Sequence, residues 1–400
     1  MLAPAHRSDL TSRRRFALAW TFLLAAAALG VLLRWHLVSP LPAFHYAHLL
    51  HTHSHLAFLG WVGNAFFVAA LRHFVPAREA AGYDRIWWAL QAGVVGMAAT
   101  FPFQGYGAAS IAFAALHTAA SAVFALKLWR GHRAAPAAAP HLRAALGFLL
   151  VSGAGPLALG PLAATGLRET PAYTLAIYFY LHCQYNGWFL FFLQALVLQR
   201  RADAGVPVTT SAAVRAAHWL LAGTVLTYAH SALWLEPAGW VYAAAGAGAF
   251  AQVIGCAHLW RSGRAPADGR GGLRPLERLA LGCFLAKHAL QAAVLLPGCS
   301  ALAQERWVAI AFLHLVFLGV VTPALIAWAQ AQGWWRDGMR ERAAIAVHLA
   351  GVAGTEGLLI LPGLSALTGM VPAVPLLPAL LASAGVTLLG LLALGRPGRR

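Results

Sequence analysis

The sequence has few charged residues and very few acidic ones. Only 10% of its 400 residues are Asp, Glu, Lys or Arg, and Asp and Glu together number 12, whereas 60% of the residues are hydrophobic. This composition, with a mean hydropathy of +0.66, is not that of a soluble domain. The composition predicts a polytopic membrane protein, whose backbone polar groups are satisfied within helices.

Cysteine is also scarce, and its spacing excludes two kinds of site. The four cysteines form no Cys-x-x-Cys pair and no Cys-x-x-Cys-His motif, so neither a zinc ribbon nor a covalent c-type haem is indicated. A disulfide framework is not expected either. The first residues include TSRRRFALAW, which resembles a twin-arginine export signal, but the apolar run continues into a full helix without a small-residue cleavage site. We interpret it as an uncleaved anchor.

Apolar segments of roughly 20 residues match a hydrocarbon core of about 30 Å, and they recur along the whole chain. We predict twelve transmembrane helices, near 16–34, 44–71, 86–101, 108–129, 142–163, 171–199, 213–233, 238–260, 277–296, 306–330, 343–361 and 372–394. The expected fold is therefore all-α. It consists of one twelve-helix domain over 16–395, between a basic tail at 1–15 and a short tail at 396–400.

The net charge of +17 indicates topology, not a nucleic acid partner. If the N-terminus is cytoplasmic, nearly all of the 29 Lys and Arg fall in the N-tail, the C-tail or the connections from even to odd helices; the exceptions are Arg34, Arg168, Arg306 and Lys287. The positive-inside rule thus predicts two cytoplasmic ends in a bacterial-type inner membrane. The expected neighbours are the lipid bilayer and its anionic cytoplasmic headgroups.

Five histidines lead into the second predicted helix, in the segment FHYAHLLHTHSHLAFLGWVGNAFF. At 100° per residue, His45, His48, His51 and His55 form one stripe, whereas His53 lies on the opposite face. Polar groups inside a membrane are costly and are usually functional, so we expect these imidazoles to bind something. The alternative is a patch of histidines at the outer surface, which is the stronger interpretation for His45 and His48.

Histidines of six predicted helices fall in the outer half of the membrane, several of them roughly 12–17 Å from the outer helix ends at 1.5 Å per residue. They are His55, His117, His182, His230, His288 and His314. Scattered core histidines would not be expected to share one layer. The layer predicts a haem or metal site toward the outer side of the membrane.

A weak internal repeat selects two of these histidines. His55-Leu-Ala-Phe-Leu-Gly in the second helix corresponds to His314-Leu-Val-Phe-Leu-Gly in the tenth, and both helices run from outside to inside. Such a pair can offer one imidazole to each side of a porphyrin. Gly60 and Gly319 leave room for a ring or for close helix packing.

These segments resemble the catalytic subunit of haem-copper oxidases and nitric oxide reductases. The resemblance implies a twelve-helix bundle with a non-covalent b-type haem, and it carries the axial ligand role of a low-spin haem to His55 and His314. The segment His53-Ser-His55 is similar to the family's His-x-His motif, which the family has on helix 10, and we include His51 and His53 among the candidate haem-binding residues. NnrS-type haem- and copper-containing membrane proteins, associated with nitric oxide response, are a similar comparison.

Helix 6 adds a second match, because Tyr180-Leu-His182-Cys-Gln-Tyr-Asn186 resembles the family helix whose histidine binds copper or non-haem iron. His230 resembles one member of the family's helix 7 histidine pair. The departures are that Phe312 stands where the proximal histidine is expected, that His230 lacks its adjacent histidine, and that Asn186 replaces a glutamate of nitric oxide reductases. A second metal site would then use His182 and His230, completed by His53, His117 or His288.

Two charges are expected within the membrane. Lys287 and Glu356 both fall in the outer half, where an isolated charge is expensive. They can pair with each other, relay protons, or bind a haem propionate through Lys287. Glu356 can also remain neutral by protonation.

Three functional classes are consistent with the sequence. The first is a respiratory oxidoreductase that acts on oxygen or nitric oxide and receives electrons from a partner protein. The second is a non-catalytic haem or copper protein for nitric oxide response or metal handling. The third is a transporter with a histidine-lined site, although the histidines form a layer on one side and not a path across the membrane. The sequence leaves open whether the chain is an enzyme.

Overall fold

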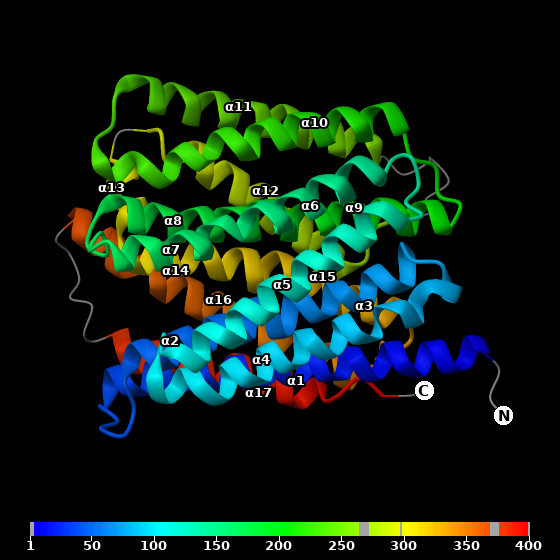
Figure 1. Ribbon diagram of the computed structural model, residues 1–400, viewed down its shortest axis with the longest axis horizontal. Coiled ribbons are helices and arrows are strands. Elements are labelled where there is room, and N and C mark those ends of the chain that lie inside the picture. Colours follow the sequence, from blue (N-terminus) through cyan, green and yellow to red (C-terminus); the bar gives the residue numbers. More distant parts are fainter. Residues whose placement is uncertain (1–3, 264–271, 297, 369–375, 399–400) are drawn as a thin grey trace. The chain divides into compact units, whose positions relative to one another are not determined.

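The computed structural model describes residues 4–263, 272–296, 298–368 and 376–398, and within them every regular element is a helix. Within each of the two compact units described below, Figure 1 shows long helices that run roughly parallel or antiparallel to one another. The all-α prediction is therefore confirmed for the described part of the chain. The predicted start of the last helix, at 372, lies outside the described residues.

Nine helices in the described ranges are long and apolar enough to cross a membrane. They are Asp9–Val38, Tyr46–His73, Ala77–Gln104, Ala108–Gly131, Ala139–Ala164, Gly239–Ser262, Arg306–Ala331, Met339–Pro362 and Leu377–Leu394. A multi-pass membrane protein is thus supported, whereas the count of twelve and the cytoplasmic location of both ends stay predictions.

The remaining predicted segments are helical too, but they carry more polar side chains. The segment 171–199 lies within α8, η3 and α9, 213–233 within α10 and η4, and 277–296 overlaps α12. These segments include His182, His230 and Lys287, in that order. Buried polar groups lower the mean hydropathy of a helix that packs inside a bundle, and they mark functional positions in membrane proteins.

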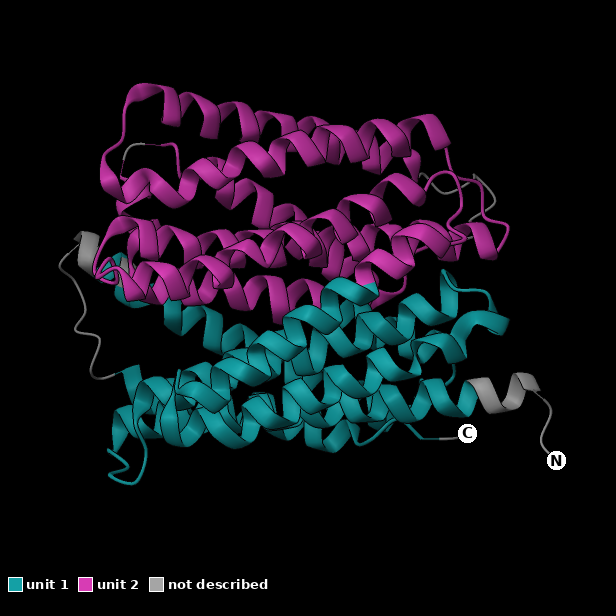
Figure 2. Ribbon diagram, viewed as in Figure 1, with its two compact units in different colours: residues 1–124, 322–400 teal, residues 125–321 magenta. Residues whose placement is uncertain are grey.

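The chain divides into two compact units, coloured separately in Figure 2. Unit 1 comprises residues 1–124 and 322–400, and unit 2 comprises 125–321. The elements of unit 1 are α1 (Pro4–Val38), α2 (Tyr46–His55), η1 (Leu56–Gly63), α3 (Asn64–His73), η2 (Ala77–Tyr83), α4 (Asp84–Gln104), most of α5 (Ala108–Gly131), α15 (Thr322–Ala331), α16 (Met339–Thr368) and α17 (Leu377–Leu394).

Unit 2 starts at the end of α5. Its further elements are α6 (Ala139–Ser152), α7 (Ala154–Ala164), α8 (Pro171–His182), η3 (Cys183–Phe189), α9 (Leu190–Asp203), α10 (Thr210–Thr227), η4 (Tyr228–Leu235), α11 (Gly239–Ser262), α12 (Pro275–Ala293), α13 (Cys299–Gln304), α14 (Arg306–His314) and η5 (Leu315–Val321). The prediction of one undivided domain is not tested by this division, because each unit is built from membrane-type helices of the same kind.

Small residues let α10 and α11 of unit 2 approach closely. A Cβ atom on Gly248 would lie 2.8 Å from the backbone nitrogen of Thr227, and one on Gly223 would lie 2.8 Å from the carbonyl oxygen of Gly248. Helix pairs in membranes rely on such close backbone approach, since lipid provides no hydrophobic drive between helices. This packing fixes the polar side chains that project from the two helices.

Apolar side chains cover the outside of both units. Phe103 is 79% exposed and Trp240 is 73% exposed. In a water-soluble protein such rings would be a liability, whereas in lipid they are the expected surface. Several of the polar side chains described below, such as His117, His182 and Lys287, are instead buried within their units.

Candidate functional site

Three histidines of the predicted layer share one local structure. His55, His182 and His314 are each the last residue of an α-helix that continues directly into a π-helical segment. These segments are Leu56–Gly63, Cys183–Phe189 and Leu315–Val321. Short π-helical segments within α-helices are rare and occur frequently at functional sites.

A glycine follows each of these histidines by five residues: Gly60, Gly187 and Gly319. Five residues is the hydrogen-bond register of a π turn, in which a carbonyl accepts from the N–H of residue i+5. The repeat of His55-Leu-Ala-Phe-Leu-Gly and His314-Leu-Val-Phe-Leu-Gly indicates this spacing in the sequence, but it does not extend to His182. The signal that could have identified His182 is the spacing of histidine and glycine alone. It is hard to recognise there, because Cys-Gln-Tyr-Asn stands where the other two copies have mainly apolar residues.

The three glycines serve close packing in the structure. A Cβ atom on Gly60 would lie 2.8 Å from the Cβ atom of Phe22 on α1. At Gly319 it would lie 3.0 Å from the Cys283 Sγ on α12, and at Gly187 it would overlap the Phe148 ring on α6. Each π segment is therefore pressed against a neighbouring helix at its glycine. This closeness holds the preceding histidine at a defined place in its unit.

In unit 1, His55 is the inner member of a row of imidazoles. The His45 and His48 ring centroids are 4.6 Å apart, and His45 is exposed. Farther along α2, the rings of His48 and His51, and then of His51 and His55, interact electrostatically. The row thus begins at an exposed end of α2 and leads inward to His55.

Aromatic rings and His117 surround the inner end of this row. The His55 ring lies 4.5 Å from the Phe101 centroid, and the His51 ring lies 4.6 Å from the Tyr106 centroid. His117 on α5 is buried and also acts electrostatically on His55. The Nε2 atom of His55 is buried and has no hydrogen-bond partner. A neutral imidazole with such an open nitrogen suits an iron or copper ion.

His53 lies on the other side of α2 and has a different role. Its Nδ1 atom donates to the carbonyl oxygen of Ala26 on α1 at 2.8 Å. The ring also sits close to Gly30, where a Cβ atom would come within 3.3 Å of the His53 Cε1. His53 therefore joins α2 to α1, as its place opposite the stripe suggests.

In unit 2, the ring of His182 uses both nitrogens. Its Nε2 donates to the carbonyl oxygen of Thr224 at 2.7 Å, and its Nδ1 accepts from the Asn186 side-chain amide at 3.0 Å. These bonds define a neutral tautomer, because one ring nitrogen must donate while the other accepts. A metal could bind Nδ1 only if Asn186 rotated away. The four-residue spacing of His182 and Asn186 on one helix face made this pair predictable.

His230 offers an open nitrogen near His182. Its Nδ1 donates to the carbonyl oxygen of Thr227 at 3.0 Å, whereas its Nε2 is buried without a hydrogen-bond partner; the backbone of Gln291 on α12 also interacts with the ring. His182 and His230 interact electrostatically. The π segment η3 and the 3₁₀ segment η4 thus bring together two of the predicted second-site histidines.

Lys287 and His288 come from α12 in the same unit. The Lys287 side chain is completely buried, with no hydrogen-bond partner for its Nζ atom. The ammonium acts electrostatically on His182, His230 and His288. His288 donates from Nδ1 to the carbonyl oxygen of Phe284 at 2.8 Å, so its free ring nitrogen is Nε2.

Glu356 has a different charged neighbour from the one considered in the sequence analysis. Glu356 and Arg34 interact electrostatically within unit 1, and Arg34 also donates to the carbonyl oxygen of Gly30 at 3.0 Å. Lys287 belongs to unit 2, where the thiol of Cys256 acts on it electrostatically.

His314 is half-buried in unit 2, and the ring of Phe312 lies 6.1 Å from Tyr185. Phe312 occupies the position at which the resembled family has a histidine, and here it packs as part of an aromatic contact. Phe317, in the π segment after His314, packs against Phe189 at 5.4 Å. The residues after His182 and His314 therefore touch within one unit.

An aromatic cluster supports the π segment of unit 1 at the end away from His55. Trp61 on η1 donates from Nε1 to the hydroxyl of Thr322 at 3.1 Å and stacks edge-on against Trp20 at 5.8 Å. Trp61 had no assigned role in the sequence analysis. Its contacts indicate that it holds η1 against α1 and α15.

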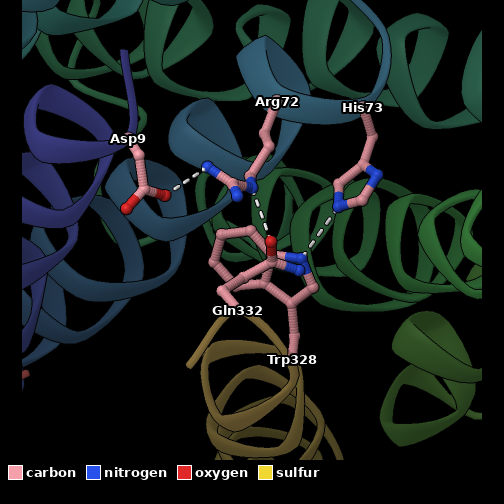
Figure 3. Close-up of polar contacts among 5 residues, drawn as sticks. All are labelled: Asp9, Arg72, His73, Trp328 and Gln332. Atoms are coloured by element: carbon pink, nitrogen blue, oxygen red, sulfur yellow. Dashed lines mark hydrogen bonds and ion pairs between the residues drawn. The ribbon is translucent and has the colours of Figure 1, made fainter. Parts of the chain in front are cut away.

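Figure 3 shows polar contacts of Arg72 and His73 at the end of α3. Arg72 forms an ion pair with Asp9 at 2.8 Å and donates to the side-chain oxygen of Gln332. Beside it, Trp328 donates from Nε1 to the Nε2 atom of His73 at 3.0 Å. These contacts tie the end of α3 to α1 and α15 within unit 1, and His73 accordingly has a structural role.

No group of three or more His, Cys, Asp or Glu side chains in the described ranges is arranged to hold a metal ion. Electrostatic interactions nevertheless relate His182, His230 and His288 to Lys287 in unit 2. In unit 1 they relate His51 and His117 to His55. The assignment of these residues to haem or metal stays a prediction. No protein-family model matches the chain, and no curated protein matches it.

Proposed function

We propose that this chain is a multi-pass membrane haem protein that handles oxygen or nitric oxide. The observation that carries the proposal is the threefold occurrence of a histidine at the junction of an α-helix and a π segment, with glycine five residues later. A local structure that is rare elsewhere is repeated here at three histidines of the predicted layer.

His55 is the residue best suited to bind haem iron. Its Nε2 atom is buried and unpartnered, and the rings of Phe101 and Tyr106 provide an apolar edge of the kind that a porphyrin contacts. A buried polar atom without a partner is unusual and calls for an explanation such as a bound group. When bound, a haem would supply reversible redox chemistry and an iron centre for a gas ligand.

His314 is the proposed second axial ligand, on the basis of its sequence pattern and its π segment. His51 and His53 have other neighbours: His51 packs against Tyr106, and His53 is hydrogen-bonded to Ala26. The assignment of the two axial positions to His55 and His314 rests on the sequence pattern that they share. Electrons would come from a separate redox partner, because no c-type haem motif is present.

The second proposed site, for copper or non-haem iron, centres on His230. The open Nε2 of His230 provides one ligand, and the Nε2 of His288 on α12 is another candidate. His182 can contribute its Nδ1 only after the Asn186 amide has moved away from that nitrogen. His117, the fourth candidate from the sequence, belongs to the His55 region of unit 1. The second site is thus built from unit 2 alone.

The axial ligands can be tested by the optical spectra of single variants. His55→Ala and His314→Ala should each lose or convert a low-spin haem spectrum, because an iron deprived of one strong-field imidazole changes its spin state. His348→Ala and His132→Ala serve as controls, since neither residue belongs to the proposed site; His348 is bonded to the Thr387 carbonyl, and His132 lies between α5 and α6. Unchanged spectra in both ligand variants would refute the assignment.

Gas chemistry is tested separately. With an electron donor, the wild type should consume oxygen or nitric oxide if it is an enzyme, and His230→Ala should abolish consumption while leaving the low-spin spectrum intact. If the wild type binds carbon monoxide or nitric oxide without consuming either gas, the protein acts in sensing or scavenging. If it binds neither, the proposed role in gas chemistry is wrong.

A further inference from the structure

Lys287 is a buried cation whose charge is not compensated by the residues proposed to bind haem. The side chain is completely buried in a unit of membrane-type helices, and its Nζ atom has no hydrogen-bond partner. A buried ammonium group costs several kcal/mol unless an opposite charge or a set of acceptors compensates it.

Unit 2 provides no carboxylate for this purpose in its described part. Glu277 forms an ion pair with Arg200 at 2.9 Å, and Asp203 accepts from Gln199 at 2.8 Å. The other acidic residues described in this unit, Glu169, Glu236 and Glu305, lie in or next to the connections between helices. The ionisable partner of opposite sign that acts on Lys287 is the thiol of Cys256.

The described part of unit 2 contains other buried polar atoms without hydrogen-bond partners. They include the Nε2 of His230 and the side-chain oxygens of Asn186, Gln252 and Gln291. The amide nitrogen of Gln252 is held by the Thr227 hydroxyl at 3.2 Å, and that hydroxyl in turn donates to the Thr224 carbonyl. One connected network therefore links α10, α11 and the ring of His182, and several of its atoms remain unused.

Unpartnered buried polar atoms are infrequent in folded proteins, and a group of them indicates water or a ligand that fills their hydrogen-bonding capacity. Because the Lys287 ammonium group is positively charged, the ligand is expected to carry a negative charge. His230, which acts electrostatically on Lys287, can add a second positive charge or a neutral donor, depending on its protonation. The carboxamides of Gln252 and Gln291 can present either their oxygen or, after rotation, their nitrogen.

We propose that Lys287 and His230, when His230 holds no metal, form a buried site for a small oxyanion or carboxylate, with water bridging to the carboxamide side chains. The anion supplies the charge that the helices lack, and it accepts hydrogen bonds from the ammonium group and the imidazole. His230 is only half-buried and lies on η4 next to the connection to α11, so it forms the accessible side of the site.

The site would bind an anionic oxygen. Such an oxygen can belong to a free anion or to a propionate of the proposed haem. The second source rests on the proposed function, whereas the first does not. A free ion of this kind is as small as formate or nitrite, because the site lies between packed helices. A bulky anion such as gluconate is excluded by the same packing.

The sequence makes a direct measurement simple, because Lys127 and Lys287 are its only lysines. Lys127 is exposed on α5. In a Lys127→Met protein, selectively labelled with ¹³C at the lysine ε carbon and reconstituted in lipid nanodiscs, the one lysine resonance reports Lys287. This variant leaves the proposed site untouched, because Lys127 lies on α5 and not on the helices that carry the site.

Titration with sodium formate or sodium nitrite at constant ionic strength should shift this resonance saturably, and gluconate should not. His230→Ala in the same background should weaken binding at least tenfold, about 1.4 kcal/mol, because one charge-assisted hydrogen bond is lost. Protein prepared with and without haem separates the two sources. Saturable shifts in both preparations indicate a free-anion site, and shifts only in the haem-free protein indicate a propionate.

The proposal is overturned if neither preparation responds to formate or nitrite, or if gluconate produces the same shift. A response that His230→Ala leaves unchanged overturns the role of His230. The absence of haem in every preparation would refute the proposed function but not the anion site, since the haem-free titration stands on its own.

Discussion

The glycine at the end of the His55 π turn gives the sharpest test of the packing described for unit 1. In Gly60→Ala the new methyl carbon would lie 2.8 Å from the Phe22 Cβ and 2.9 Å from its Cγ. Carbon atoms pack at about 3.5–4.0 Å, so α1 and η1 must separate by roughly 0.7–1.2 Å. The Phe22 Cβ is fixed to the α1 backbone, and rotation of its ring cannot relieve the contact.

The expected cost can be separated from the intrinsic effect of replacing glycine. Gly385→Ala on α17 is the matched control, because nothing lies within 4 Å of a Cβ at that position. Alanine in an open helical position should stabilise by about 0.5–1 kcal/mol. Overpacking costs about 1–3 kcal/mol, so Gly60→Ala should have a free energy of unfolding lower than that of Gly385→Ala by about this amount.

The same substitution should also disturb His55. Phe22, Leu56 and Phe101 belong to one core cluster, and the Phe101 ring contacts His55 at 4.5 Å. Unfolding of each variant in mixed micelles measures the stability difference, and the haem spectrum measures the effect on His55. If Gly60→Ala is as stable as Gly385→Ala and its spectrum is unchanged, then the close packing of η1 against α1 is not what positions His55.

Three further substitutions test the polar contacts. Asn186→Ala should cost about 1–3 kcal/mol in unfolding experiments, because the His182 Nδ1 is left buried without its donor; a neutral effect would contradict the tautomer described. His53→Ala should cost about 0.5–1.5 kcal/mol through loss of its bond to α1 but keep the haem spectrum, and a lost spectrum would make it a ligand instead. Asn64 and Gln91 exchange two hydrogen bonds at 2.8 and 3.1 Å, so replacing either by Leu should destabilise more than replacing both, and additive single effects in a double-mutant cycle would show that the pair is not coupled.

Much of the fold could be predicted from the sequence, because membrane helices are specified by length and hydropathy. The predicted segments 44–71 and 306–330 correspond closely to the helices Tyr46–His73 and Arg306–Ala331. The π segments within them were not predictable from periodicity, since the i+5 register alters the helix over only one or two turns. Only the five-residue spacing from histidine to glycine hinted at them.

The site residues were identified more easily than their neighbours. Depth in the membrane selected His55 and His182, but nothing in the sequence indicated that the His182 Nε2 donates to a carbonyl oxygen on α10. Charge also suggested that Lys287 could pair with Glu356, but the sequence did not indicate that Arg34 interacts with Glu356 within unit 1. Partners across helices depend on rotation and register, which a single sequence does not reveal.

The central claim, that the chain holds haem, is tested most directly by pyridine-haemochrome analysis of the purified wild-type protein, combined with its oxidised and reduced spectra. The account predicts at least one non-covalent b-type or related haem per chain, with a low-spin spectrum that depends on both His55 and His314. Well-folded protein that contains no haem after expression with ample haem supply would contradict it.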